Sequence, residues 1–387
     1  MKIGEIMAGN TIADLQAARK NKNDEFYTQL TDIEEELKHY NHLSPNNQFK
    51  DKVVYCNCDD PEESNFFKYF AANFSLLGLK KLICTHYEYD EKKKSYLLTI
   101  TRGRDINKDG KIGRADVEKK EFLFSNGDFR SDECIALLKQ SDIVCTNPPF
   151  SLFREYVAQL IEYKKKFLII GNQNAITYKS IFILIREDKL WLGESIHSGD
   201  REFLVPNDYP LTAVGSRIDE KGKKYIRIKG VRWFTNLDYK KRHEDFTPKK
   251  YQTYVGNEKN YPKYHNYDAI NIDRSENIPI DYDGVMGVPI TFLDKWNPDQ
   301  FEIVELGIVG SCTFTNNRKM EILDGKTGLP TGKFTMNAKG TLYKKFDPSK
   351  PISPNNKKAF RDVETGEFYS SIYARVLIKR KPTGEKK

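Results

Sequence analysis

Short apolar segments alternate with amphipathic segments along the first half of this chain, and this alternation constrains the fold more than any other feature. The segments expected to form strands are Lys52–Cys56, Lys81–Thr85, Tyr96–Thr101, Asp142–Thr146 and Lys166–Ile170. Helical periodicity is seen at residues 12–22, 32–39, 64–77, 133–139 and 152–163. Strands that alternate with helices in this way predict an α/β fold with a parallel sheet.

Polar side chains follow several of these expected strands. Cys56–Asp60 comes after the first, Glu88 after the second, and Asn147 directly after Asp142–Thr146. Asp128 is also expected to follow a strand. Ligands of parallel α/β sheets bind beyond the carboxyl ends of the strands. The sequence therefore predicts that the chemistry collects at one edge of the sheet.

The most informative motif is Asn147-Pro148-Pro149-Phe150, which an apolar strand enters without a break. The prolines fix the turn and leave carbonyl groups with no competing N–H. The Asn147 side-chain oxygen and the Pro148 carbonyl can each accept one hydrogen of an exocyclic amine, and the Phe150 ring can stack on a flipped base. The alternative is an ordinary turn after a strand. The position after a buried strand of an α/β sheet favours the catalytic interpretation.

This motif resembles the catalytic motif of amino-methyltransferases, and longer stretches resemble the EcoRI family of adenine-specific DNA methyltransferases. These stretches extend from about residue 10 to residue 310. They are Asn23–Gln29, Cys56–Ser64, Gly127–Ser131, Thr146–Glu155, Arg232–Asp238 and Gly287–Leu293. The resemblance implies a Rossmann-like class I methyltransferase sheet with a C-terminal DNA-recognition region. It also implies S-adenosyl-L-methionine as methyl donor and N6 of a flipped adenine in double-stranded DNA as acceptor.

The resemblance also implies roles for individual residues. Asn147, Pro148, Pro149 and Phe150 form the catalytic turn. The expected donor-binding residues are Phe26, Tyr27 and Thr28 at the methionine end, Cys56, Asn57, Cys58, Asp59 and Asp60 in the loop after the first strand, Glu88 at the ribose, and Asp128 and Phe129 at the adenine. The loop after the first strand departs from the usual glycine-rich pattern, because no glycine occurs between Tyr55 and Leu77. Asp128 has an alternative role as a turn or helix-capping residue.

The character of the chain changes after about residue 195. We expect a catalytic domain over residues 1–195 and a DNA target-recognition region over residues 196–387, with strands near 284–310 returning to the catalytic sheet. Residues 217–270 are dense in basic and aromatic side chains, and the formal net charge of +8 suits a polyanionic partner. The candidate phosphate contacts are Arg217, Lys223, Lys224, Arg227, Lys229, Arg232, Lys240, Lys241 and Arg242.

A second candidate site is the loop from Asp105 to Asp116, which fits the template of a calcium-binding loop. Asp105, Asn107 and Asp109 supply oxygen atoms at the first, third and fifth positions, and Lys111 would supply a backbone carbonyl. Asp116 stands at the last position, where a longer Glu is usual. The pattern predicts structural Ca²⁺, and the alternative is a polar hairpin loop rich in turn-forming residues.

Composition excludes several other classes of protein. No apolar run approaches the roughly 18–20 residues of a membrane span, and the N-terminus lacks the apolar core of a secretory signal. Cys56 and Cys58 have no second close pair and no histidine at zinc spacing, so neither a zinc site nor a disulfide framework is expected. His86 and His197 are interpreted as ordinary polar residues. We therefore expect a cytoplasmic protein without a membrane partner.

Three functions remain open from the residues alone. The first is site-specific adenine N6-methylation by a monomer on DNA, alongside a cognate restriction endonuclease or in an orphan methylation system. The second keeps the enzyme class and changes the substrate to RNA guanine or protein glutamine. The third is a non-catalytic DNA-binding protein with a methyltransferase fold, which the glycine-free loop would suit. The intact motif favours an enzyme, and the basic region together with the family resemblance favours DNA.

Overall fold

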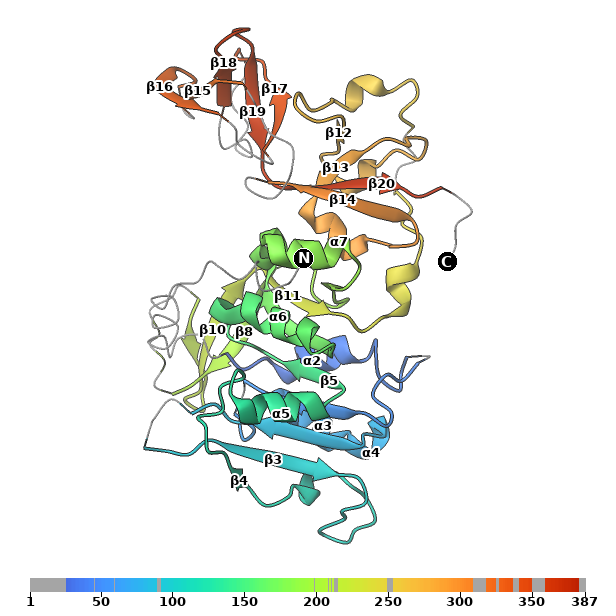
Figure 1. The fold of residues 1–387 in the computed structure, drawn as a ribbon, viewed down its shortest axis with the longest axis vertical. Coiled ribbons are helices and arrows are strands. Elements are labelled where there is room, and N and C mark those ends of the chain that lie inside the picture. The colour runs from blue at the N-terminus through green and yellow to red at the C-terminus, as the bar shows by residue number, and fades with distance from the viewer. Residues whose placement is uncertain are drawn as a thin grey trace. The chain divides into compact units, whose positions relative to one another are not determined.

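The structure is a computed structural model with a mixed α/β fold and several sheets (Figure 1). It describes residues 26–382 except 45, 59, 89–91, 198, 208, 210, 212–214, 249–252, 309–317, 325–326, 337–340 and 350–358. The expected helix at 12–22 and the candidate Asp59 lie outside the described residues. The chain divides into two compact units, Met1–Ala175 with Leu190–Lys240, and Ile176–Lys189 with Lys241–Lys387.

The first unit contains an eight-stranded sheet in the order β4-β3-β2-β1-β5-β6-β11-β7. Its strands are β1 (Val53–Cys56), β2 (Lys81–Thr85), β3 (Tyr96–Thr101), β4 (Glu121–Phe122), β5 (Ile143–Thr146), β6 (Lys166–Asn172), β7 (Trp191–Leu192) and β11 (Val231–Thr235). The four central strands β2, β1, β5 and β6 are parallel. The five strands expected from the sequence are all present.

The strands β3 and β11, which flank the parallel centre, run antiparallel to it. β3 pairs antiparallel with β2 because a short connection without a helix among its described residues can only return the chain in the opposite direction. On the other side, β11 pairs antiparallel with β6, and Val231 lies opposite Asn172. The sequence placed the returning strands at 284–310, whereas β11 is the strand that joins this sheet. β11 is fully buried and short, so its pattern does not distinguish it from other apolar runs.

Helices cover this sheet on both faces. They are α2 (Leu30–Leu37), α3 (Asn65–Ala72), α4 (Phe74–Leu77), α5 (Asp132–Gln140) and α6 (Phe153–Glu162), with 3-10 turns at η3 (Arg114–Asp116) and η4 (Phe150–Leu152). α3 connects β1 to β2 and α6 connects β5 to β6, so the two crossovers leave in opposite directions along the sheet. Right-handed crossovers then place α3 and α6 on opposite faces, and Figure 1 shows α5 and α6 over the face nearest the viewer. The carboxyl ends of β1 and β5 flank the point where the direction changes.

A smaller antiparallel sheet completes the first unit. It consists of β8 (Asp200–Val205), β9 (Arg217–Ile218) and β10 (Lys224–Lys229), in the order β8-β10-β9. Phe203, Val205 and Ile226 of this sheet are buried in the same core cluster as Val54 and Cys56 of β1. This sheet therefore shares its core with the eight-stranded sheet. Leu204 of β8 also pairs with Tyr27, which precedes β1.

The second unit contains α7 (Lys179–Arg186) and two sheets. The first sheet has the order β12-β13-β20-β14, and the second has the order β16-β15-β18-β19-β17. The strands are β12 (Ile270–Asn271), β13 (Met286–Pro289), β14 (Phe301–Gly307), β15 (Met320–Leu323), β16 (Pro330–Thr335), β17 (Leu342–Lys345), β18 (Ala359–Asp362), β19 (Phe368–Ile372) and β20 (Arg375–Arg380). Further 3-10 turns are η5 (Gln173–Thr177), η6 (Lys240–His243), η7 (Glu258–Asn260), η8 (Ser275–Asn277) and η9 (Ile290–Lys295). None of the described helices has the length and apolar content needed to cross a membrane.

The five-stranded sheet is an insertion into the other sheet of this unit. β14 and β20 are antiparallel neighbours, and Gly307 at the end of β14 pairs with Arg375 at the start of β20 (Figure 1). The chain therefore leaves the sheet at one position and returns directly opposite. Residues 308–374 replace what would otherwise be the turn of a hairpin.

Candidate active site

Asn147 follows the last residue of β5 and is 5% exposed. Its side-chain Nδ2 donates a hydrogen bond to the Phe26 carbonyl. Because a carbonyl only accepts, this bond fixes the amide with its oxygen facing the other way. Asn147 Oδ1 is buried and has no hydrogen-bond partner among the described residues. A buried acceptor without a partner costs about 1–3 kcal/mol, which is typical of a site that a ligand completes.

The Phe26 carbonyl is held in place by its neighbours. The Tyr27 N–H donates to the Leu204 carbonyl at 2.8 Å, and the Leu204 N–H donates back to Tyr27 at 3.1 Å. Asn65 of α3 donates from Nδ2 to the Thr28 carbonyl at 2.7 Å. The segment from Phe26 to Thr28 is therefore fixed between β8 and α3. Thr28 is 2% exposed, and its Oγ1 has no partner among the described residues.

Aromatic rings surround this point. Phe150 is half-buried at the start of η4, and its ring centroid lies 5.6 Å from that of Phe26 in an edge-to-face arrangement. Phe203 of β8 and Tyr209 lie 5.9 Å and 6.3 Å from the Phe26 ring. The turn that contains the unpaired Asn147 oxygen is therefore flanked by flat aromatic rings, on which a base could stack.

The loop after β1 is tied to the catalytic turn. Asn57 is 2% exposed, and its carbonyl accepts a hydrogen bond from the Thr146 hydroxyl. Its Oδ1 accepts a hydrogen bond from the Tyr156 hydroxyl of α6. Cys58 has a φ of 69°, in the left-handed region that glycine adopts most easily. Cys58 therefore adopts the backbone conformation that a glycine has in the usual glycine-rich loop.

Asp60 belongs to a polar cluster that also includes His86 and Tyr96. The Tyr96 hydroxyl donates to Asp60 at 2.8 Å, and His86 Nε2 lies 3.5 Å from the Asp60 carboxylate. His86 stacks on the Tyr96 ring, with centroids 5.0 Å apart. Burial raises the pKa of Tyr96, and the Asp60 hydrogen bond raises it further, so this hydroxyl remains a donor at all ordinary pH values. From the sequence, His86 was interpreted as an ordinary polar residue and Tyr96 was not singled out, because neither belongs to a motif.

Glu88 is half-buried beyond the end of β2, and its N–H donates to the Asn126 carbonyl at 2.9 Å. This bond places Glu88 beside the loop that contains Gly127 and Asp128. Gly127 has a φ of 80°, and a Cβ there would overlap the His86 carbonyl. The loop therefore approaches the end of β2 closely only because residue 127 is glycine.

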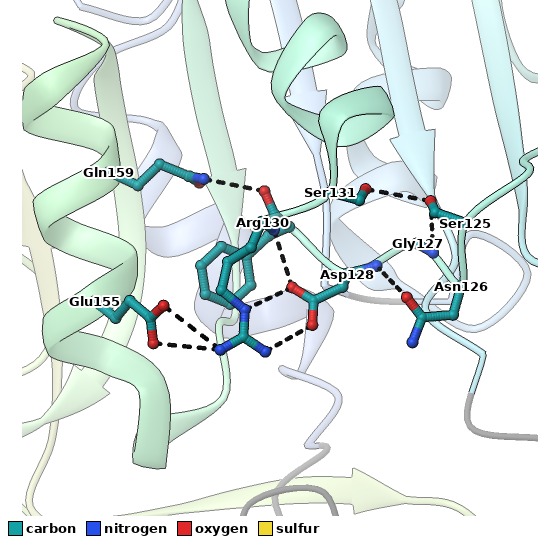
Figure 2. A network of polar contacts seen from close by, with 9 residues as sticks. Ser125, Asn126, Gly127, Asp128, Arg130, Ser131, Glu155 and Gln159 are labelled. Carbon is teal, nitrogen blue, oxygen red and sulfur yellow. Dashed lines mark hydrogen bonds and ion pairs between the residues drawn. The ribbon is translucent and has the colours of Figure 1, made fainter. Parts of the chain in front are cut away.

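Asp128 is held by Arg130 (Figure 2). Arg130 donates from Nε to Asp128 Oδ1 at 2.9 Å and from Nη2 to Oδ2 at 2.7 Å. Its Nη1 lies 3.4 Å from the Glu155 carboxylate of α6. The hydrogen bond to Asp128 raises the pKa of Arg130 further above its usual value. The backbone N–H of Arg130 also donates to Asp128 Oδ1 at 2.9 Å. Asp128 therefore also stabilises the turn in which it lies.

Phe129 fixes the same loop against α6. It is 5% exposed and packs edge-to-face on Tyr156, with centroids 5.0 Å apart. Gln159 of α6 donates from Nε2 to the Phe129 carbonyl at 3.1 Å (Figure 2). The helix that follows the catalytic turn thus contacts the Asp128 loop through three side chains, those of Glu155, Tyr156 and Gln159. The sequence did not identify these contacts, because each pairs residues from distant segments.

Most of the candidate phosphate contacts lie on the surface. Lys223, Arg227, Lys229, Lys240 and Lys241 are exposed. Arg217 is exposed but forms a bidentate ion pair with Glu202, 2.8 Å and 2.6 Å long, and lies over the Tyr225 ring. Lys224 is half-buried and donates to the Tyr209 carbonyl at 3.0 Å.

The structure places two of these candidates inside the protein. Arg232 of β11 is 2% exposed and donates to the carbonyls of Val231 and His197. Arg242 is 7% exposed, forms an ion pair with Asp188 and lies over the Trp296 ring. This placement is a correction, because both guanidinium groups satisfy internal partners and do not face a surface phosphate.

In the loop predicted to bind calcium, side-chain oxygen atoms accept hydrogen bonds from backbone N–H groups of the same loop. Asp105 accepts the Gly110 N–H at 2.8 Å, Asn107 accepts the Asp109 N–H at 3.2 Å, and Asp109 accepts the Lys111 N–H at 2.8 Å. Asp116 is 1% exposed and accepts the N–H groups of Ile106, Asn107 and Gly113, and the Gly113 bond is the main cause of its lowered pKa. No group of three or more His, Cys, Asp or Glu residues in the described part of the chain could hold a metal ion. The structural Ca²⁺ is not supported, and the loop is a polar turn.

Comparisons with known proteins agree on one family. The family model described as adenine-specific methyltransferase EcoRI matches residues 14–381. The type II methyltransferase M.EcoRI of Escherichia coli is 50% identical over 313 residues, which cover 78% of this chain and 94% of that protein. M.MpnI of Mycoplasma pneumoniae is 43% identical over 291 residues and M.MgeORF184P of Mycoplasma genitalium is 41% identical over 290, each covering 74% of this chain and 84% of the relative. No solved structure matches the chain.

Proposed function

This chain belongs to the EcoRI family of adenine-specific DNA methyltransferases. From that premise we propose that the turn from Asn147 to Phe150 holds a flipped adenine while its N6 is methylated. Membership of the family implies S-adenosyl-L-methionine as the methyl donor. The observation that carries the assignment is the buried Asn147 Oδ1, which has no partner among the described residues. An exocyclic amine is a donor that fits this acceptor.

The residues of the turn have separate tasks in this proposal. Asn147 Oδ1 accepts one amine hydrogen and the Pro148 carbonyl accepts the other, which directs the nitrogen lone pair toward the donor. The Phe26 carbonyl holds the Asn147 amide in the required orientation. Phe150 stacks on the base. The donor, when bound, supplies an electrophilic methyl group on a sulfonium sulfur, and the protein aligns the two reactants.

The donor site is proposed at the carboxyl ends of β1 and β5, where the sheet changes direction as in Rossmann-like folds. Thr28 Oγ1 suits a polar group of the methionine end, because it is buried and has no partner among the described residues. Cys56 to Asp60 lie beneath the donor and Glu88 faces the ribose. Asp128 and Phe129 face the adenine. Asp128 Oδ1 accepts both the Arg130 backbone N–H and Arg130 Nε, and Oδ2 accepts Arg130 Nη2, so these contacts fix the direction of the carboxylate.

The division into a catalytic region over 1–195 and a recognition region over 196–387 stays a prediction, as do action as a monomer, a cognate restriction endonuclease and a cytoplasmic location. The exposed Arg227 and Lys229 of β10, with Lys223, support DNA contact by this part of the chain. Catalysis on RNA guanine or protein glutamine, and a non-catalytic role, have no observation in their favour here.

The test is the variant Asn147→Ala. Loss of the acceptor should lower methyl transfer to DNA by about 10²–10³-fold or more, while calorimetry should find donor binding retained. Tritium transfer to DNA, RNA and protein measured side by side gives the substrate class. The exposed Asn46→Ala, outside the predicted recognition region, serves as control and should keep full activity. Activity of Asn147→Ala near that of the wild type on DNA would show that the catalytic assignment is wrong.

A further inference from the structure

We propose that the hairpin of β15 and β16, in the sheet inserted between β14 and β20, is a separate surface that binds the backbone of duplex DNA independently of sequence. The proposal rests on the proposed function in that both take DNA as the partner. It assigns to the inserted sheet a contribution to affinity rather than to the choice of the methylated site.

The first observation is the distribution of charge along the chain. Residues 308–387 contain 17 Lys and Arg against 7 Asp and Glu, a formal excess of ten positive charges. The whole chain has a formal net charge of +8, so residues 1–307 carry a net charge of −2. The segment that contains the inserted sheet is therefore one of two strongly basic parts of the chain, and the other is residues 217–270, with 14 Lys and Arg against 7 Asp and Glu.

The second observation separates compensated from uncompensated charges in this sheet. Three basic residues are neutralised by acidic neighbours, in the pairs Arg318–Asp362 at 2.8 Å, Arg361–Glu321 at 2.6 Å and Lys345–Glu367 at 2.7 Å. Lys319 and Lys333 are exposed and form no ion pair with a described residue. The Lys319 ammonium lies 4.6 Å from the centre of the Phe334 ring. Among the described basic residues of the inserted sheet, Lys319 and Lys333 at β15 and β16 are thus the exposed ones without an ion pair, and Lys344 of β17 is half-buried.

The third observation is the shape and surface of the hairpin. β15 and β16 pair antiparallel, and the Asp324 N–H closes the turn with the Leu329 carbonyl at 2.8 Å. β16 is an edge strand of the sheet. Phe334 of β16 is 49% exposed, and Leu329 and Met336, which flank the strand, are 65% and 53% exposed. Exposed apolar side chains on an edge strand indicate a contact surface, and the neighbouring lysines indicate an anionic partner.

Duplex DNA satisfies both features. Its major groove is about 12 Å wide and admits a two-stranded β-ribbon, while lysine side chains on the ribbon reach the phosphates. The apolar side chains then contact sugar and base surfaces. Phosphate contacts carry no sequence information, so the hairpin adds affinity for any duplex.

The hairpin is presented on a firm base. The inserted sheet is joined to the neighbouring sheet at both ends, because Gly307 and Arg375 are paired. The His265 N–H donates to the Tyr343 carbonyl at 2.8 Å, and Asn266 Nδ2 donates to the Thr341 carbonyl at 2.7 Å. These bonds hold the inserted sheet to the rest of its unit, so binding requires little ordering of the chain.

The experiment measures binding of the full chain to a duplex of guanine and cytosine only, which contains no adenine to methylate. Fluorescence anisotropy over a range of salt concentrations gives the affinity and its salt dependence. Lys319→Ala with Lys333→Ala should weaken binding at least several-fold and reduce the slope of log affinity against log salt by about 1–2, because each lost phosphate contact contributes about 0.9. Phe334→Ala should weaken binding without changing the slope.

The control removes the same charge from the first unit, as Lys50→Ala with Lys80→Ala, two exposed residues. Unchanged affinity and slope in the Lys319 and Lys333 variant would overturn the proposal, as would an equal effect of the control. Anionic lipid vesicles or single-stranded RNA competing better than the duplex would also overturn it. Failure of the wild type to methylate adenine-containing DNA would instead contradict the proposed function, because the binding assay does not depend on catalysis.

Discussion

Arg130 contacts two segments that are far apart in the sequence. It holds both carboxylate oxygens of Asp128 and reaches Glu155 on the helix after the catalytic turn. Charge-assisted bidentate contacts of this kind fix orientation as well as adding energy. We infer that Arg130 acts as a positioning residue, which aims the Asp128 carboxylate at the donor site while it ties the loop to α6.

The variant Arg130→Ala should therefore weaken donor binding about tenfold or more, since hydrogen bonds to charged groups contribute about 1.5–3 kcal/mol. The KM for the donor should rise more than kcat falls, because the catalytic turn itself is unchanged. Arg130→Lys should restore part of the affinity with a single contact. Glu155→Gln, which keeps the pair with Asp128, is the control and should have a small effect. Donor affinity equal to that of the wild type in Arg130→Ala would show that Asp128 needs no such support.

Single residues could be predicted from the sequence only where a local pattern carries the chemistry, and their roles stay predictions. The Asn147 side-chain oxygen was predicted as an acceptor from the motif, and the structure leaves that oxygen buried without a described partner. His86 was interpreted as an ordinary polar residue, and Arg130 and Tyr96 were not singled out. The contacts of His86 and Tyr96 with Asp60, and of Arg130 with Glu155, join distant segments. Arg232 was expected on the surface, since a basic residue in a basic region gives no sign that its strand is central in the sheet.

At the scale of elements, β6 and α6 meet at a glycine. A Cβ on Gly171 of β6 would overlap the ring of Phe153, the first residue of α6. Phe153 is 2% exposed and packs against Phe234 of β11, with centroids 4.9 Å apart, so the ring has little room to move. The start of α6, three residues after Phe150, is therefore set by the absence of a side chain on the neighbouring strand.

Gly171→Ala should lower the free energy of unfolding by about 1–3 kcal/mol, the usual cost of overpacking a core. It should also reduce kcat, because a shift of Phe153 moves the catalytic turn. Urea unfolding and steady-state methylation measure the two effects. Gly113→Ala is a suitable control, because its φ is −169° and its Cβ would meet only the Ala71 carbonyl at 3.3 Å. Equal stability of the two variants would contradict this account of the contact.

The elements were predicted better than their directions. All five strands of the first half were expected, since each is a short apolar run bounded by polar residues. The antiparallel pairing of β3 and the addition of β11 were not, because they depend on connection lengths and on a partner strand distant in the sequence. The helix expected over 64–77 is two helices, α3 and α4, that meet at Asn73, whose side chain donates to the Tyr69 carbonyl.

For the whole molecule, the inserted sheet can be removed as a unit, and this deletion tests its role more directly than single substitutions do. Gly307 and Arg375 are paired, so an Asn-Gly turn can replace residues 308–374 and close β14 and β20 into a hairpin. The first unit does not include this segment, so methylation should persist when DNA is saturating. The shortened chain loses Leu342 from its core cluster, which should cost some stability. Because the deletion removes an excess of five positive charges, methylation of dilute DNA should fall more steeply with salt in the wild type than in the shortened chain. A folded shortened chain that is inactive even at saturating DNA would show that the insertion takes part in catalysis and does not only add affinity for DNA.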